Sequence, residues 1–348
     1  MSNVLDAVLD NVQIPHQPWV VITDSSTFSG VPLFRELLRR SLARRESTLL
    51  IAVVHPPKTL LPRAVRVDEA NLKIINLTET VKGYSTEESW QNLHERVLSS
   101  LAASGSHVQL FIDALDVLAE DYTPARTIQL IRSLLRTILT LKAPSRLVVV
   151  LPHTSSFHPQ LLTPTLSSAL TLLSPHHPRL LTHLSRIYMK AIEPSPSPAF
   201  WQILERSRER RTGENLAWSA DEGVEISIDW FEPRGAIVQI LIRKSTGGSK
   251  GITRILAALT RAVVGLKTVS LSELVSTDPI SGPGALSRTM GNEMEIDVPF
   301  NLALTEEQRR RRAEVPLPYA HEGEGVGAGA GAGLDWGDEE DDDDDEEI

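Results

Sequence analysis

The chain has 348 residues, and 41% of them are apolar, which is enough to build a sizeable core. Its net charge of −10 belongs to the carboxyl-terminal end, because 11 of the 45 acidic residues lie in 335–348 and the other 34 nearly balance the 35 lysines and arginines. The absence of cysteine excludes disulfides, cysteine zinc sites, thiolate nucleophiles and iron–sulfur clusters.

Residues 1–18 are predicted to be a polar lead that precedes the folded domain. Asp6 and Asp10 stand where a signal peptide needs positive charge. No apolar run approaches about 18 residues, the length that a membrane helix requires. We therefore expect a soluble intracellular protein without a membrane partner.

Strands and helices alternate between residues 19 and 151. The predicted strands are the short apolar runs 19–23, 48–55, 73–77 (a weaker edge strand), 108–113 and 146–151. The predicted helices are 33–45, one capped by Ser85 and Glu88, and one that begins at Thr123 and Pro124. This alternation is typical of βαβ crossovers, so we predict an α/β fold with a mostly parallel sheet flanked by helices.

The second half is rich in proline, which favours loops and hairpins. A last strand is predicted at 236–243 and a helix at 251–262, while the strand order around 166–193 stays open. The predicted domain plan is a folded domain, a linker, a docking segment and a tail, at 19–265, 266–299, 300–320 and 321–348 respectively. The tail consists almost entirely of Gly, Ala, Asp and Glu, so we expect it to be disordered.

The loop after the first predicted strand stands where nucleotide-binding proteins carry the phosphate loop G-x-x-x-x-G-K-[ST]. When Gly30 is aligned with the second glycine, Ser25 replaces the first. Val31 then replaces the phosphate-binding lysine, and Pro32 replaces the magnesium-binding hydroxyl and removes an N–H donor. The architecture is of the nucleotide-binding type with degenerate Walker motifs, so we predict neither a cofactor nor a catalytic residue.

Asp113 ends the predicted strand 108–113, at the position of the magnesium-orienting acid in such folds. Because the loop lacks a lysine, the favoured interpretation is a carboxylate satisfied by local N–H groups. Asp113 is then a relic of a nucleotide site.

Two further motifs are weak. The stretch 247–251 matches G-x-S-x-G, the nucleophile elbow, with Ser249 as nucleophile, but the required downstream histidine is absent before His321 in the tail. A Gly-rich turn is the favoured alternative. Five histidines lack zinc-site spacing and are interpreted as surface-loop residues, so no metal is predicted: His153, His158, His176, His177 and His183.

Two arginine clusters are candidates for phosphate contact, because the guanidinium group forms bidentate pairs with phosphate. The first is on the helix 33–45, where the helix dipole explains it equally well: Arg35, Arg39, Arg40, Arg44 and Arg45. The second is the better candidate of the two for nucleic acid, because it lies in a turn-rich region near Trp201 rather than on a long solvated helix: Arg206, Arg208, Arg210 and Arg211.

Several stretches together resemble one family. They are Phe200-Trp201 with the second arginine cluster, the strand 238–243 followed by 247–254, and above all 300–319 followed by the acidic end. The last of these reads Phe300-Asn-Leu-Ala-Leu-Thr-Glu-Glu-Gln308 and then Val315-Pro-Leu-Pro-Tyr319. Over essentially its whole length the chain resembles the fungal Elongator complex protein 5 family.

The resemblance implies a RecA-like domain without working Walker motifs, in a non-catalytic subunit. It implies a heterohexameric ring with Elongator complex proteins 4 and 6, which binds tRNA and serves the core Elongator subunits that modify the wobble uridine U34. It also implies the cytoplasm and nucleus as localisation. The second arginine cluster then becomes the set of tRNA contact candidates.

The docking segment 300–320 has apolar residues on both sides of a charged, helix-like run, Glu306–Arg312. We expect it to dock onto a partner or onto the sheet edge through Phe300, Leu302, Leu304, Val315, Leu317 and Tyr319. The acidic tail either competes with phosphate for arginines or serves solubility alone.

Two other classes stay open. One is an enzyme, either a degenerate P-loop ATPase completed by a partner subunit or an esterase that uses Ser249. The other is a regulatory binding module with an acidic interaction tail.

Overall fold

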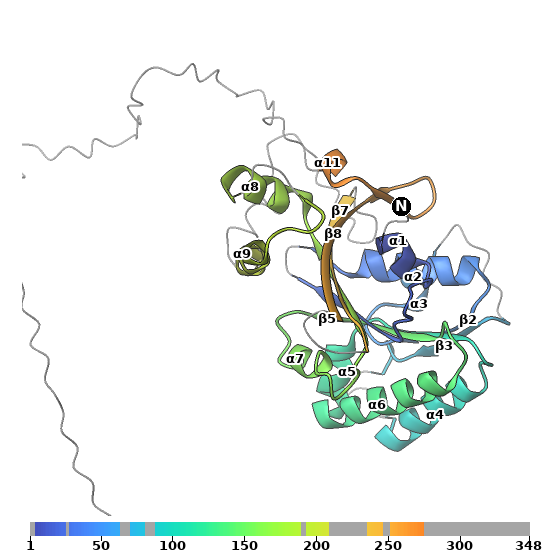
Figure 1. Cartoon of the computed structure of the whole chain (residues 1–348). Coiled ribbons are helices and arrows are strands. Elements are labelled where there is room, and N and C mark those ends of the chain that lie inside the picture. The colour runs from blue at the N-terminus through green and yellow to red at the C-terminus, as the bar shows by residue number, and fades with distance from the viewer. Residues whose placement is uncertain are drawn as a thin grey trace, which may run out of the picture. The chain divides into compact units, whose positions relative to one another are not determined.

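A mixed sheet of nine strands organises the described part of the chain (Figure 1). The computed structural model describes residues 4–25, 28–62, 70–80, 88–188, 193–208, 235–245 and 251–274, all within a unit that spans 1–285. The strand order is β3-β2-β4-β5-β1-β6-β7-β8-β9. The strands are β1 Trp19–Asp24, β2 Ser47–Ala52, β3 Leu72–Asn76, β4 Val108–Ile112, β5 Arg146–Pro152, β6 Leu170–His176, β7 Gly235–Arg243, β8 Ile252–Arg261 and β9 Leu266–Val269.

The strands β1 to β6 pair in parallel, whereas β6-β7, β7-β8 and β8-β9 pair antiparallel. Parallel neighbours need crossover connections, and helices supply most of them here. The helices are α1 Val4–Leu9, α2 Val31–Ala43, α3 Pro57–Leu60, α4 Trp90–Ala102, α5 Leu115–Tyr122, α6 Pro124–Thr140, α7 His158–Leu161, α8 Pro178–Tyr188, α9 Pro198–Arg208 and α11 Leu271–Leu274. The predicted mostly parallel α/β fold is confirmed.

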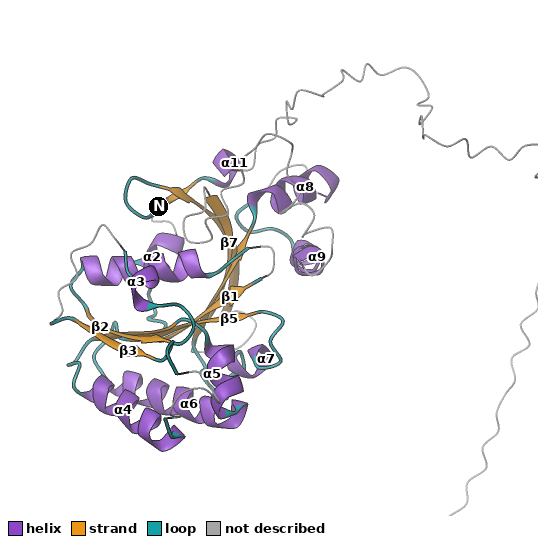
Figure 2. Ribbon diagram, turned by 180° about the vertical axis from the view of Figure 1, so that it is seen from behind, coloured by secondary structure: helices purple, strands orange, loops and turns teal. Residues whose placement is uncertain are grey.

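Helices cover both faces of the parallel part of the sheet (Figures 1 and 2). On β1, Trp19 and Val21 pack into the core beneath α4, α5, α6 and α7, and Val20 and Ile22 pack into the core beneath α1, α2 and α3. Successive side chains of a strand point to opposite faces, so burial on both faces requires a continuous apolar run. That run is what made β1 recognisable in the sequence.

A third apolar cluster lies where β7 and β8 extend beyond the parallel strands. It joins Phe200 and Trp201 of α9 to Ile237 of β7 and Leu256 of β8, and it includes residues of α8 and α11. Within the described ranges, no helix has the length and apolar character needed to cross a membrane.

The folded unit extends beyond the predicted 19–265 at both ends. The predicted polar lead contains α1, whose Leu5, Val8 and Leu9 are fully buried against the α2 face. The predicted linker contains β9 and α11. All three elements are too short to give a periodic signal in the sequence, and tertiary contacts hold them in place.

The helix predicted at 251–262 is wrong, because this segment is strand β8. Leu256 and Ala258 face one apolar cluster, and Ala257 and Leu259 face another. β8 is hydrogen-bonded to β7 along one edge and to β9 along the other. Pairing on both sides overrides the helix propensity of leucine and alanine. The predicted cap of α4, Ser85 with Glu88, is also wrong. The helix begins after Ser89, whose hydroxyl accepts the Asn92 N–H.

Candidate functional site: the loop after the first strand

The loop after β1 lies at the carboxyl edge of the sheet, between β5 and β6, and leads into α2. Asp24 ends β1, and its Oδ1 accepts the N–H of Gly30 at 2.7 Å and the N–H of Ser25 at 3.2 Å. A phosphate loop offers such amides to a bound anion. Here a carboxylate of the chain itself takes two of them.

Other N–H groups of the loop also have internal acceptors. The Phe28 N–H donates to the Ser25 hydroxyl at 3.1 Å, and the Val31 N–H donates to the Ser29 hydroxyl at 3.2 Å. Pro32 has no N–H to offer. In the described part of this loop, which excludes 26 and 27, the amides of Ser25, Phe28, Gly30 and Val31 already have acceptors within the chain.

The residues aligned with the lysine and the second glycine serve packing. Val31 is only 4% exposed and lies in the apolar core beneath α2, so its side chain does not face a ligand. A Cβ on Gly30 would come within 2.8 Å of the Ile22 side chain and 3.2 Å of the Thr23 carbonyl oxygen. Glycine at position 30 is therefore required by the close approach of the loop to β1.

Asp113 lies directly after β4 with a fully buried side chain. Its carboxylate accepts the N–H groups of Val53, Val54 and His55 at 2.6, 3.2 and 2.7 Å, and His55 Nδ1 lies 3.0 Å away. Both oxygens are engaged, so Asp113 joins the end of β4 to the end of β2. This geometry matches the interpretation of a carboxylate satisfied by local N–H groups.

The surroundings of the loop are acidic. Asp116, in the first turn of α5, has its pKa raised mainly by burial, and the charges of Glu120 and Asp24 raise it further. The N–H groups of Asp116 and Val117 oppose this rise. A triphosphate at this edge would meet carboxylates, which repel it.

His177 lies between the loop and α8. Its Nδ1 accepts the Arg179 N–H at 3.2 Å, as an N-cap does, and its ring meets Phe28 edge-on at 6.1 Å between centroids. Burial, with a smaller contribution from Arg179, lowers the pKa of His177 to about 4. The ring is therefore neutral at physiological pH, as an accepting Nδ1 requires.

The interpretation of the histidines as surface-loop residues is wrong for His176, because β6 was not predicted; His177 follows that strand and is half-buried. His176 is 2% exposed on that strand, and its Nε2 lies 3.2 Å from Gln239 Oε1. Over the described ranges, no three His, Asp or Glu side chains gather as metal ligands. The side chain of His183 lies outside the described residues.

The match to the nucleophile-elbow motif does not lie in the structural context that this motif requires. That motif needs a strand followed by a helix, whereas 247–251 joins two antiparallel strands, β7 and β8. Ser249 itself lies outside the described residues.

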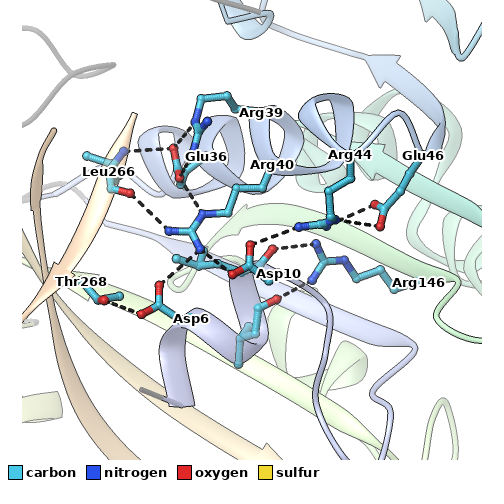
Figure 3. A network of polar contacts seen from close by, with 12 residues as sticks. Asp6, Asp10, Glu36, Arg39, Arg40, Arg44, Glu46, Arg146, Leu266 and Thr268 are labelled. Carbon is cyan, nitrogen blue, oxygen red and sulfur yellow. Dashed lines mark hydrogen bonds and ion pairs between the residues drawn. The ribbon is translucent and has the colours of Figure 1, made fainter. Parts of the chain in front are cut away.

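The arginines of α2 are engaged inside the fold (Figure 3). Glu36, 2% exposed, pairs with Arg39 at 2.6 Å and with Arg40 at 2.8 Å. Arg40 also reaches Asp6 and Asp10 of the amino-terminal segment, at 3.2 and 3.0 Å. Arg44 pairs with Asp10 and Glu46, at 3.1 and 2.9 Å, so acidic partners neutralise three of the five arginines of the first cluster, which argues against phosphate contact there.

Of the second cluster, Arg206 is exposed on α9. The side chain of Arg208, as well as Arg210 and Arg211, lies outside the described residues. The docking candidates Phe300, Leu302, Leu304, Val315, Leu317 and Tyr319 and the acidic tail also lie outside them.

The structure adds a surface that the sequence analysis did not single out. The outer side of α6 carries the exposed Arg126, Arg132 and Arg136. A shallow polar groove of about 340 Å³ runs beside it, lined by Trp90, Gln91, His94, Glu95, Arg126 and Gln129. The spacing of these arginines on the face opposite the apolar stripe was the available signal.

A family model described as Elongator subunit Iki1 matches residues 5–334. The chain belongs to the Elongator subunit Iki1 family. This is the Elongator complex protein 5 family, so the resemblance is confirmed.

Among solved structures, the Iki1-family chain is similar to a KaiC-like protein from the hyperthermophilic archaeon Pyrococcus horikoshii OT3. The two are 10% identical, with a TM-score of 0.40 over 73% of this chain and 90% of that chain. A search of curated proteins found no match.

Proposed function

We propose that this Iki1-family chain is a non-catalytic subunit of a heterohexameric ring with Elongator complex proteins 4 and 6. In this proposal the ring binds tRNA and supports modification of the wobble uridine U34 by the core Elongator subunits, in the cytoplasm and nucleus. Membership of the family supports the association with other Elongator subunits.

The observation that carries the non-catalytic role is the closed loop after β1. Asp24 occupies the amides of Ser25 and Gly30, and Val31 is buried where a phosphate-binding lysine would stand. Phosphoryl transfer depends on cations and N–H donors around the phosphates, and this loop supplies neither from those positions. This geometry supports a scaffold and binding role for the domain.

Co-purification of the full chain tests the assembly. Co-expression with Elongator complex proteins 4 and 6 is expected to give one complex whose mass, measured by native mass spectrometry, corresponds to two copies of each subunit. A stable, active monomer that leaves both partners unbound would contradict the proposal.

Titration of ATP and magnesium separates this function from an ATPase completed by a partner. We expect no saturable micromolar binding attributable to this chain, either alone or in the complex. ATP turnover by the complex that disappears on Asp113→Asn would favour the ATPase instead.

A further inference from the structure

The solvent face of α6 carries unbalanced positive charge. The helix has 17 residues, with three arginines and no acidic residue. Its apolar side, which includes Leu130, Ile131 and Leu134, is buried against the sheet, so the charged side is left to solvent. Arg126, Arg132 and Arg136 are each exposed.

These three guanidinium groups differ from several arginines on and beside other helices of the fold. Over the described ranges, no carboxylate lies within ion-pair distance of any of them, whereas Arg39 and Arg40 on α2 and Arg44 directly after it each pair with acidic residues. On the neighbouring α4, Arg96 pairs with Glu88 at 2.6 Å. The charges on α6 are therefore available to an outside anion.

The geometry of the face suits an extended polyanion. At a rise of about 1.5 Å per residue, Arg126 and Arg136 lie about 15 Å apart along the axis, with Arg132 between them. Gln129 lies between the first two arginines and adds an amide donor. Lys142, exposed just beyond the end of the helix, extends the positive charge.

The face lacks the apolar centre of a protein interface. Its one large exposed apolar side chain is Leu139, 68% exposed, in the last turn of the helix. The buried centre of a protein–protein interface is richer in apolar area and poorer in charge. Arginines in a polar setting are instead the usual contacts to a phosphodiester backbone, which they bind in bidentate fashion.

We propose that the outer face of α6 is a contact surface for the phosphate backbone of RNA, through Arg126, Arg132 and Arg136. The choice of RNA rests on the proposed function. The contact is independent of base sequence, because guanidinium groups that bind phosphates read no base edges.

The test uses the complex of the full chain with Elongator complex proteins 4 and 6 and a labelled tRNA transcript. The variant is Arg126→Gln, Arg132→Gln and Arg136→Gln together. The matched control changes three dispersed, exposed lysines, Lys58→Gln, Lys73→Gln and Lys267→Gln, which alters the net charge equally. Thermal unfolding of both complexes verifies that the exposed substitutions leave the fold intact.

We expect the α6 variant to bind tRNA about tenfold more weakly at low salt, with a slope of log affinity against log salt that is shallower by up to about 3. The control should keep the wild-type slope. Equal weakening in variant and control would overturn the inference, because net charge alone would then explain the effect.

Two outcomes separate this inference from the proposed function. If the wild-type complex binds tRNA and the α6 variant binds it equally well with the same slope, the inference fails and the proposed function stands. If the wild-type complex binds no tRNA, both fail. A variant that loses affinity for a polyglutamate peptide but not for tRNA also overturns the inference, since the partner is then an acidic protein.

Discussion

At the scale of single residues, a carboxylate that accepts two backbone N–H groups competes directly with any anion for those donors. Asp24 holds the amides of Ser25 and Gly30 in this way and, unlike a ligand, does not dissociate. Val31 adds a second obstacle, because its side chain is in the core beneath α2. Restoring the consensus lysine should therefore not restore the site.

The substitution Val31→Lys tests this directly. We expect it to destabilise the chain by several kcal/mol, on the order of 3, because an ammonium group is forced into an apolar core. Val31→Met, of similar length and without charge, should cost about 1–2 kcal/mol. Urea denaturation measures the difference, and an ATP titration should show no gain for either variant. If Val31→Lys bound ATP saturably and had the same free energy of unfolding as Val31→Met, the lysine position would face a usable site.

His177 predicts a pH dependence. Its pKa is about 4 in the folded chain and about 6.5 when unfolded, so the unfolded state binds the extra proton. The stabilising effect of the neutral ring is complete above about pH 6.5 and is lost as the pH falls toward 4. At pH 5 the loss is up to about 2 kcal/mol.

The variant His177→Asn isolates this effect, because asparagine keeps an N-cap acceptor but does not titrate. Urea denaturation at pH 7 and pH 5 is expected to show a smaller loss for the variant than for the wild type. Other groups titrate equally in both, so they cancel in the comparison. Parallel losses in the two proteins would mean that His177 does not titrate as described.

At the scale of elements, α2 ties the two ends of the unit together. Its Glu36 accepts the Leu266 N–H of β9 at 3.0 Å, and its Arg40 donates to the Leu266 carbonyl oxygen at 3.3 Å (Figure 3). Burial alone would lower the pKa of Arg40, but bonding to Glu36 and the charge of Asp10 raise it above its usual value. The guanidinium group thus stays charged while it links α1, α2 and β9.

Arg146, the first residue of β5, also attaches α1 to the sheet. It is fully buried and donates to the carbonyl oxygens of Val8 and Leu9, at 2.6 and 3.3 Å, at the end of that helix. Burial lowers the pKa of Arg146 to about 9, with a smaller effect from Arg44. Carbonyl groups at a helix end attract a cation, so backbone oxygens stabilise the buried charge, and the charges of Glu46 and Asp10 also favour it.

A substitution of Gly265, in the turn before β9, should weaken the link between α2 and β9. Its φ is +72°, and a Cβ there would lie 2.3 Å from both Arg39 Nε and Glu36 Oε2. We expect Gly265→Ala to destabilise the chain by about 2–4 kcal/mol, because strain adds to the disruption of a buried ion pair.

The matched control is Gly105→Ala, whose φ is +91° with no atom within 4 Å of the added Cβ. It should cost only the strain of a positive φ, about 1 kcal/mol. Urea denaturation compares the two, and hydrogen exchange at β9 should rise in Gly265→Ala alone. Equal effects would show that backbone strain, not the Glu36 contact, dominates at both turns.

At the scale of the whole molecule, the family model covers 5–334 and so includes the docking segment 300–320. The apolar residues of this segment and its charged middle are typical of a peptide that docks on a partner. The acidic residues 335–348 lie beyond the family match. Assembly is therefore expected to depend on the segment and not on the acidic end.

Two truncations test this expectation. Truncation after Met294 should weaken assembly with Elongator complex proteins 4 and 6, whereas truncation after Gly333 should leave it unchanged. Size-exclusion chromatography of the co-expressed subunits measures the fraction assembled. Identical elution of the two truncated complexes would show that the segment is passive in assembly.

The sequence by itself determined the parallel strands β1 to β5, the degenerate phosphate loop and the family, because these depend on local patterns. A strand such as β1, buried on both faces, must be apolar throughout. The absence of the phosphate-binding lysine can be read from the sequence whatever conformation the loop adopts. Only the tertiary structure decided that β8 is a strand, that α1 belongs to the core, and which arginines are free. Pairing on two edges, burial of a six-residue helix and neutralisation by Glu36 or Asp10 each depend on residues distant in the chain, and such contacts leave no periodic signal in the sequence.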